Sequence, residues 1–476
     1  MRVFALRCTA FSLTLAYSDD HTRKPMTAPK MHLTMQIVAG TGIEAGAWRW
    51  RGAPADGFIN IDATVHAARA AERGKFDAVF FADTPGVVND VAVGPPSFAP
   101  LEPIVVLTAI ARETERIGLV ATSSTTFNHA YTVARQFRAL DLISNGRAGW
   151  NTVTTGRAIA ALNYRAELPS RTERYAHAQE FIASVMALWG SWPEGALLLD
   201  KETGIFADAD RIQPIMVSGQ RMFSRGPLDL PPSPQGQPVI FQAGGGNNGL
   251  TLAGMFANAV YSNAFDISAA VSYWRDVRRA AKAFGRDPDH MTAFTGIVTS
   301  VASTEAEALK RRSEIDALGD LEGRVNYFQT QIGIPLEMKD IDKPIPVELL
   351  RMARPHPGDP RSPNALRLAR EGWTVREIIA HGVINYHPVA VGTPEKIADM
   401  LQHWFEAGIG NGFNITPDAT DGADDFVDHV VPILQERGLF RTEYEGTTLR
   451  EHLGIPYQNG LPEGHPALGI ADRLPG

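Results

Sequence analysis

The chain has 476 residues, of which 44% are hydrophobic and 21% charged, and its formal net charge is -8. This composition is that of an ordinary soluble protein with a large core, and the absence of basic runs excludes an electrostatic footprint for nucleic acid. The single cysteine, Cys8, excludes an internal disulfide or a cysteine-rich metal site and favours a reducing, cytoplasmic location.

Residues 1–30 are predicted to be a disordered extension, or a stretch that precedes the true start at Met26 or Met31. A short apolar run follows Arg2, but Arg7 interrupts it and no small-residue cleavage site follows, which argues against a secretory signal. No other stretch has the long uncharged run that a membrane helix requires. We therefore expect no membrane association.

From Met31 onward, apolar runs of strand length alternate with stretches of helical spacing. The eight predicted strands lie at 31–39, 76–82, 117–121, 147–153, 238–243, 259–263, about 291–300 and from 412. The predicted helices lie at 60–75, 101–115, 131–143, 173–192, 250–258, 267–285, 394–407 and 424–437.

Two long stretches interrupt this alternation. Residues 195–236 are irregular and rich in proline, and residues 304–389 contain a second group of prolines. Repeated strand and helix predict a parallel sheet, and eight such units favour a (β/α)8 TIM barrel over an open doubly wound sheet. We predict an α/β barrel over residues 31–440, with insertions after strands 4 and 7, and a C-terminal tail over 441–476.

Polar side chains gather where the third and fourth predicted strands end. Thr122 follows the third strand, whereas Asn151, Thr154 and Thr155 belong to the end of the fourth. Ligands of parallel α/β proteins bind at the carboxyl ends of strands, so these side chains are predicted to form the floor of a binding site. The alternative is that they satisfy the backbone of the loops.

Two further strand ends carry candidate ligand groups. GGGNNG at 244–249 joins a predicted strand to a predicted helix, where free backbone N–H groups and the helix dipole can bind a phosphate; the alternative is a tight turn. Asp83 ends the second strand, from which its carboxylate could reach a ligand or cap the next element.

The histidines do not predict a metal site, because they are scattered and no HExxH motif is present. His129, directly after TTFN, is the one histidine expected to face the pocket and is a weak catalytic candidate; a surface loop is the alternative. No G-x-S-x-G motif supports serine hydrolase chemistry.

Long ordered motifs from Met31 to about Pro456 resemble the nitrilotriacetate and dibenzothiophene sulfone monooxygenase branch of the bacterial luciferase-like flavin-dependent monooxygenases. These motifs are GKFDAVFFAD, TERIGLVATSSTTFNHAYTVARQFRALDLISNGRAGWNTVTT, RYAHAQEFIASVMALWGSW, RGPLDLPPSPQGQPVIFQAG and VDHVVPILQERGLFRTEYEGTTLREHLG.

The resemblance implies a two-component enzyme that takes reduced FMN from a separate NAD(P)H:flavin reductase and uses O2 to oxidise a small organic substrate. The oxidation would cleave a C–N or C–S bond or hydroxylate the substrate. That substrate could be an aminopolycarboxylate, an organosulfur compound, an alkane or a heterocycle. We expect a homodimer or homotetramer. The alternatives are a flavin-binding protein without oxygenase activity and a deazaflavin-dependent dehydrogenase of the same superfamily.

The resemblance also implies the cofactor contacts. Asp83 and Thr122 would contact the flavin ring, with Asn151 and Thr154 beside it. Tyr175 and the backbone of Gly245 and Gly246 would contact the FMN phosphate or ribityl chain.

Three positions depart from the pattern of the family. Arg171 stands where relatives have a histidine four residues before the tyrosine, and an arginine can bind a phosphate by two hydrogen bonds. Gly245 and Gly246 replace serines, which leaves only backbone donors. Gly156 and Arg157 follow the fourth strand where some relatives have a histidine, so an acid or base role for that histidine does not transfer.

Overall fold

The computed structural model describes residues 30–467, except 40, 89–90, 93, 96–99, 165–166, 216, 219–221 and 466. The expectations for residues 1–29, with Cys8 and Met26, and for residues 468–476 lie outside the described residues.

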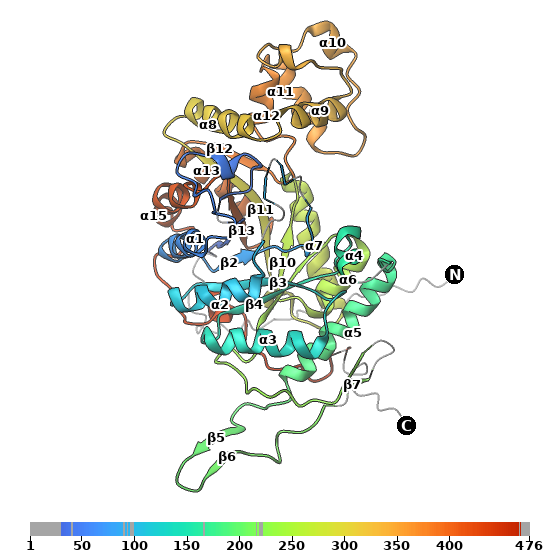
Figure 1. Cartoon of the computed structure of the whole chain (residues 1–476), viewed down its shortest axis with the longest axis vertical. Helices are drawn as coiled ribbons and strands as arrows, with labels where there is room; N and C mark the ends of the chain where they lie inside the picture. The colour runs from blue at the N-terminus through green and yellow to red at the C-terminus, as the bar shows by residue number, and fades with distance from the viewer. Residues whose placement is uncertain are drawn as a thin grey trace, which may run out of the picture.

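Eight parallel strands close into a barrel surrounded by helices (Figure 1), which confirms the predicted (β/α)8 TIM barrel. Neighbouring strands pair in chain order, and the last strand pairs with the first. The strands are β1 (His32–Gln36), β2 (Ala78–Phe81), β3 (Gly118–Ser124), β4 (Ala148–Val153), β9 (Val239–Ala243), β10 (Ala259–Ser262), β11 (Thr292–Val301) and β13 (Gly412–Pro417).

Most helices around the barrel follow the predicted positions, but two short helices, at 158–164 and 449–452, were not predicted. Those on the strands are α1 (Ile61–Arg73), α2 (Pro103–Glu113), α3 (Ala130–Ile143), α4 (Ala158–Tyr164), α5 (Arg171–Trp189), α6 (Gly246–Phe256), α7 (Ile267–Ala283) and α13 (Pro394–Glu406). After β13 the chain forms α14 (Gly422–Asp425), the π-helical turn η4 (Phe426–Val430), α15 (Val431–Glu436) and α16 (Leu449–His452). Two short 3-10 turns, η1 (Ala47–Arg49) and η2 (Pro288–His290), lie in the loops.

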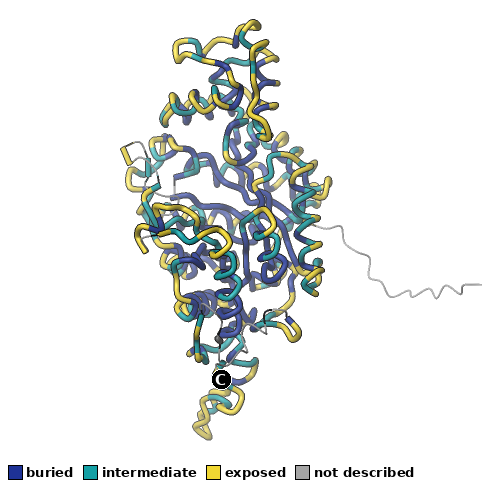
Figure 2. Tube along the Cα trace, turned by 90° about the vertical axis from the view of Figure 1, so that its right-hand side faces the viewer, coloured by how far each residue is buried: buried dark blue, intermediate teal, exposed yellow. Residues whose placement is uncertain are grey.

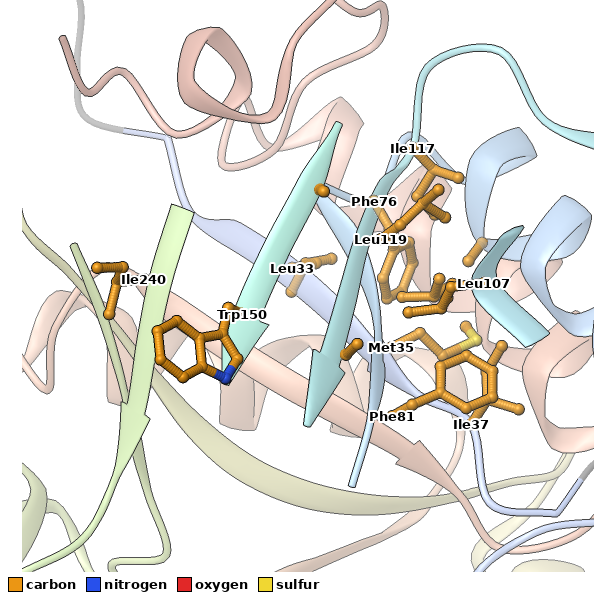
Figure 3. Close-up of a cluster of buried hydrophobic side chains, with 14 of the residues drawn as sticks. Leu33, Met35, Ile37, Phe76, Phe81, Leu107, Ile117, Leu119, Trp150 and Ile240 are labelled. Carbon is orange, nitrogen blue, oxygen red and sulfur yellow. The ribbon is translucent and has the colours of Figure 1, made fainter. Parts of the chain in front are cut away.

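Strand alternation separates two cores. Successive side chains of a strand point to opposite faces, so Leu119 packs outward against the helices whereas Val120 points into the barrel. Figure 3 shows Leu33, Met35 and Leu119 in the outer core. By the same alternation, two residues beyond Val120, Thr122 points into the barrel at the carboxyl end of β3.

The segment around α16 closes the barrel interior at the amino-terminal ends of the strands. Leu449 and Leu453 are buried against the inward-facing Val120 and Phe241. Gly118 makes room for this contact, because an added Cβ would lie 2.5 Å from a methyl carbon of Leu449. The open end of the barrel is therefore the end at which the strands terminate, and Figure 2 shows the barrel walls as buried chain.

Two long connections leave the barrel in opposite directions (Figure 1). Between β4 and β9, the chain forms an antiparallel hairpin of β5 (Leu197–Asp200) and β6 (Ile205–Ala207) and a short pair, β7 (Val217–Ser218) and β8 (Phe223–Ser224). Between β11 and β13, it forms α8 (Glu305–Leu318), α9 (Leu321–Ile332), η3 (Met338–Asp340), α10 (Val347–Arg351), α11 (Arg361–Arg370), α12 (Val375–Ala380) and β12 (Val389–Gly392).

The second connection is mostly helical and has a hydrophobic core of its own, which includes Val325, Phe328, Ile332, Leu366 and Ile378. Strand β12 was not predicted, because it lies at the end of the stretch that was assigned to the second insertion. It pairs with the carboxyl end of β11 and so ties this connection to the barrel rim.

Two helices begin earlier than the sequence predicts. Ser170 caps α5 in a capping box with Glu173, so the helix starts at Arg171 instead of 173. Helix α6 starts at Gly246 within the glycine run, instead of at 250, and Gly246 has a φ of +73°, which glycine adopts without steric cost. Both starts bear on the site.

Candidate functional site

A cavity of about 730 Å³ lies at the carboxyl ends of the barrel strands, partly covered by the second connection. Every strand from β2 to β4 and from β9 to β11 contributes to its wall, directly or through the residues that follow it. The lining includes Gln36, Glu44, Phe80, Asp83, Thr122, Asn151, Val153, Arg157, Ala243, Tyr261, Val298, Asp316, Arg324, Tyr327, Asn385, Tyr386 and His387.

Thr122 and Asn151 form a polar pair on the cavity floor. They are neighbours in the register of β3 and β4, and the Asn151 amide nitrogen donates to the Thr122 hydroxyl at 2.8 Å. The Asn151 carbonyl oxygen is buried and accepts no hydrogen bond from the protein. A buried unsatisfied acceptor costs about 1–3 kcal/mol, so this oxygen is suited to accept from a bound ligand.

Asp83 lies directly after β2 and lines the same cavity. Burial, with a smaller contribution from the nearby Glu102 carboxylate, raises its pKa to about 6. Asp83 does not cap the following helix, since Glu102 accepts the hydrogen bond from the Val105 N–H at the start of α2. Its carboxylate accepts a hydrogen bond from the Thr84 backbone and otherwise lines the cavity, where it can meet a ligand.

The residues after β4 divide between the cavity and the loop. Val153 and Arg157 line the cavity, whereas Thr154 is half-buried and is not among the lining residues. The Thr155 hydroxyl donates to the Ser124 hydroxyl at 2.8 Å and so joins the ends of β3 and β4. This contact joins two side chains, so it is neither the ligand contact nor the bond to loop backbone that the sequence analysis considered for Thr155.

Arg171, Tyr175, Gly245 and Gly246 come together at the start of α6. The Arg171 guanidinium donates to the Gly245 carbonyl oxygen at 3.3 Å and lies 5.7 Å from the centre of the Tyr175 ring. Gly245 is the N-cap residue, and no side chain caps the helix. An added Cβ on Gly245 would meet no atom within 4 Å, and one on Gly246 would lie 3.4 Å from the Arg171 guanidinium, so the start of α6 is uncrowded and lies beside a cation.

His129 does not face the cavity, which corrects the expectation from the sequence. It is the N-cap residue of α3, its side chain is exposed, and it is not among the lining residues. The histidine that does line the cavity is His387, whose imidazole nitrogen Nε2 lies 2.9 Å from the Tyr261 hydroxyl.

A network of charges forms the wall between the loop after β1 and the second connection. Glu44 accepts from Arg312 at 2.7 Å and from Arg324 at 3.0 Å, and Asn385 donates to it at 2.9 Å. Burial raises the pKa of Glu44, but the two guanidinium groups outweigh this effect and lower it to about 2. Glu44 is therefore ionised, and its charge is compensated inside the protein.

Sequence reasoning missed Glu44, Tyr261, Arg324 and His387. Glu44 lies in a glycine-rich loop and Arg324 and His387 lie in an insertion, where no strand end indicated that they reach the barrel. Tyr261 could have been found, since it ends the sixth predicted strand in the same way that Asn151 ends the fourth.

Two kinds of feature are absent from the described residues. No helix among residues 30–467, with the gaps given above, is long and apolar enough to cross a membrane. In the same part of the chain, no three or more His, Cys, Asp or Glu side chains are grouped so that they could hold a metal ion.

A closed barrel with a largely apolar cavity and a few polar side chains at its carboxyl end is the arrangement of (β/α)8-barrel enzymes. The model of the luciferase-like monooxygenase family matches residues 34–411, and the chain belongs to that family. It is a flavin-dependent monooxygenase.

Relatives support this assignment over nearly the whole chain. N-acetyl-S-(2-succino)cysteine monooxygenase of Bacillus subtilis (strain 168) is 38% identical over 90% of this chain and 98% of its own. Nitrilotriacetate monooxygenase component A of Aminobacter aminovorans is 36% identical over 87% of this chain and 94% of its own. A riboflavin lyase structure, solved with a modified FMN and riboflavin, superposes with a TM-score of 0.73 at 28% identity, covering 93% of this chain and 100% of the lyase.

Proposed function

We propose that the protein is the oxygenase component of a two-component system, which uses reduced FMN from a separate NAD(P)H:flavin reductase and O2 to oxidise a small organic substrate. The similarity to a protein named as component A of a monooxygenase supports the two-component part of this proposal. The similarity to a structure that holds a modified FMN supports the choice of flavin.

The observation that carries the proposal is that one site offers groups for both ends of FMN. The phosphate needs donors and positive charge, and these are present at the uncapped start of α6 with Arg171 beside it. The flavin ring carries N–H and carbonyl groups, and the unpaired Asn151 carbonyl oxygen offers an acceptor on the cavity floor. The groups at the start of α6 are not among the residues that line the cavity, but Ala243 lines it and is followed directly by the glycine run, so the two places are adjacent.

Each candidate residue then has a role that its chemistry permits. Arg171 and the backbone N–H groups of Gly245 and Gly246 would bind the phosphate, and Tyr175 would pack beside it. Thr122 and Asn151 would hydrogen-bond the ring. Asp83 would lie at the edge of the flavin ring. Thr154 does not line the cavity, so it would only help to hold the loop after β4 in position.

When bound, reduced FMN supplies the two electrons that the reduction of O2 requires. The chain itself orients the reactants and excludes water. The second connection covers the cavity with Arg324, Tyr327 and Tyr386, and we infer that it keeps water from the reacting atoms. We further propose a cytoplasmic location, where a reductase can supply reduced flavin, and assembly as a homodimer or homotetramer.

Reconstitution tests the proposal. Purified protein should bind FMN, and with a flavin reductase, NADH and O2 it should convert at least one compound of a panel that contains N-acetyl-S-(2-succino)cysteine, nitrilotriacetate, dibenzothiophene sulfone, dimethyl sulfide and a long-chain alkane. Mass spectrometry with ¹⁸O2 detects the inserted atom. Activity with the deazaflavin and none with FMN would favour the dehydrogenase alternative instead.

A further inference from the structure

The cavity wall opposite β3 and β4 contains a buried hydrogen-bonded pair, Tyr261 and His387. Tyr261 lies in β10, and His387 lies just before β12. The Tyr261 hydroxyl is 2.9 Å from Nε2 and 3.3 Å from Nδ1 of His387, and only 4% of His387 is exposed. Both residues line the cavity, and neither belongs to the groups assigned above to FMN.

The barrel is shaped to accommodate this pair. Gly296 in β11 lies behind it, and an added Cβ there would be 2.2 Å from the Tyr261 hydroxyl oxygen and 3.1 Å from Nδ1 of His387. The ring of Phe80, from β2 across the barrel, stacks on Tyr261 at 6.0 Å, and Tyr386 packs edge-on against His387 at 4.7 Å. These contacts from three sides fix both rings in place.

Both members of the pair are neutral near pH 7. Burial lowers the pKa of His387 to about 4. Burial, with a smaller effect of Tyr386, raises the pKa of Tyr261, although hydrogen bonding to Asn414 opposes the rise. A neutral imidazole has one N–H and one acceptor nitrogen, and a neutral phenol has one O–H.

The donor hydrogens of Tyr261 and His387 determine which hydrogen bond the pair can offer to a ligand. Two donor hydrogens are present, and one of them makes the bond between Tyr261 and His387, whichever residue donates. Within the described part of the chain, the only other hydrogen-bond partner recorded for the pair is Asn414. Since the Asn414 amide can donate to the tyrosine oxygen, it leaves the second donor hydrogen free for a ligand in the cavity.

We propose that the Tyr261–His387 pair binds the substrate by donating one hydrogen bond to an acceptor oxygen, so that the enzyme acts on carboxylates, carbonyl compounds or sulfones and not on bare alkanes or thioethers. This inference rests on the proposed function, because FMN on the side of β2, β3 and β4 leaves this side of the cavity to the substrate. A bare alkane or thioether would leave the donor buried and unpaired, which strongly disfavours its binding.

The first test uses the wild-type protein loaded with FMN. Calorimetry compares compounds that bear acceptor oxygens, namely N-acetyl-S-(2-succino)cysteine, nitrilotriacetate and dibenzothiophene sulfone, with dimethyl sulfide, dibenzothiophene and a long-chain alkane. We expect saturable binding of at least one compound from the first group and none from the second. Equal or tighter binding of the second group, or no binding of the first, would overturn the inference.

The second test uses Tyr261→Phe, His387→Leu and His387→Gln, with Tyr457→Phe as control, because Tyr457 is 45% exposed in the C-terminal segment. For the compound that binds, the first two variants should raise Kd and KM by about 10- to 100-fold, and glutamine, which both donates and accepts, should restore part of the loss. FMN affinity should change less than about twofold in every variant, as expected when no hydrogen bond to FMN is lost. Unchanged Kd and KM would overturn the inference, whereas failure of the wild type to bind FMN would overturn the proposed function instead.

Discussion

The two sides of the cavity are built from different parts of the chain. On the side of β2, β3, β4 and α6, the ends of β3 and β4 supply Thr122 and Asn151, and the start of α6 supplies backbone N–H groups. On the side of β10 and β11, the wall is completed by Arg324, Asn385 and His387 from a connection with its own hydrophobic core. The first side can stay constant while the second changes, which suits one cofactor and many substrates.

Removing the second connection should separate the two sides most completely. Replacing residues 321–383 by a short glycine–serine linker takes away helices that form their own core, so the barrel should still fold. We expect retained FMN binding, while nearly all reduced FMN is oxidised to give hydrogen peroxide and no product, because water reaches the site. Product and peroxide are measured together; unchanged coupling would show that the connection does not protect the reaction.

Glu44 ties the loop after β1 to the second connection through its bonds to Arg312 and Arg324. Glu44→Ala should cost about 3–5 kcal/mol of unfolding free energy, because Arg312 stays buried without its hydrogen-bonded carboxylate. Urea unfolding measures this loss. The exposed Glu305, paired with Lys396, is the control, and Glu305→Ala should cost at most about 1 kcal/mol.

The pH dependence of the Glu44 contribution has a defined sign. Because its pKa is lowered to about 2 in the folded protein, the stabilisation is present above its ordinary pKa of 4.5 and is lost as pH falls through about 2. The difference between wild type and Glu44→Ala should therefore shrink between pH 5 and pH 2. A difference that stays constant over this range would contradict the ionised state of Glu44.

Gly245 and Gly246 provide a matched pair on the cofactor side. Gly246→Ala places a Cβ at a φ of +73° and should destabilise the start of α6 by about 1–2 kcal/mol, with weaker FMN binding. Gly245→Ala has a φ of -98° and open space around its Cβ, so its effect on stability should be small. Thermal unfolding and FMN titration of both variants distinguish backbone strain from a general intolerance of the loop.

Asp83 should give the smallest effect. Its pKa of about 6 means that its charge appears as pH rises through 6, where it repels the anionic FMN. Between pH 5 and pH 8, the affinity of the wild type for FMN should fall a few-fold more than the affinity of Asp83→Asn. The FMN phosphate titrates in both cases, so the difference between the two proteins reports Asp83 alone. Parallel profiles for the two proteins would rule out this role.

The barrel could be predicted from the sequence because most strands are compact apolar runs that are followed by a helix of clear periodicity. Asn151 and Gly245 could be selected for the same reason, since a strand end defines their position. His129 was wrongly expected to face the pocket, because proximity to a strand end does not say which way a helix start turns. His387 reaches the cavity only through the pairing of β12 with β11, a long-range contact that no local pattern reveals.

The most direct test of the account compares FMN with riboflavin, which lacks the phosphate, in wild type and Arg171→Ala. If the phosphate lies at the start of α6, the variant should weaken FMN binding by about 10- to 100-fold, since a charge-assisted hydrogen bond is lost, and should leave riboflavin affinity unchanged. Arg275→Ala, at an exposed position of α7, serves as control. Equal losses for both flavins, or no loss for FMN, would contradict the assignment of this site.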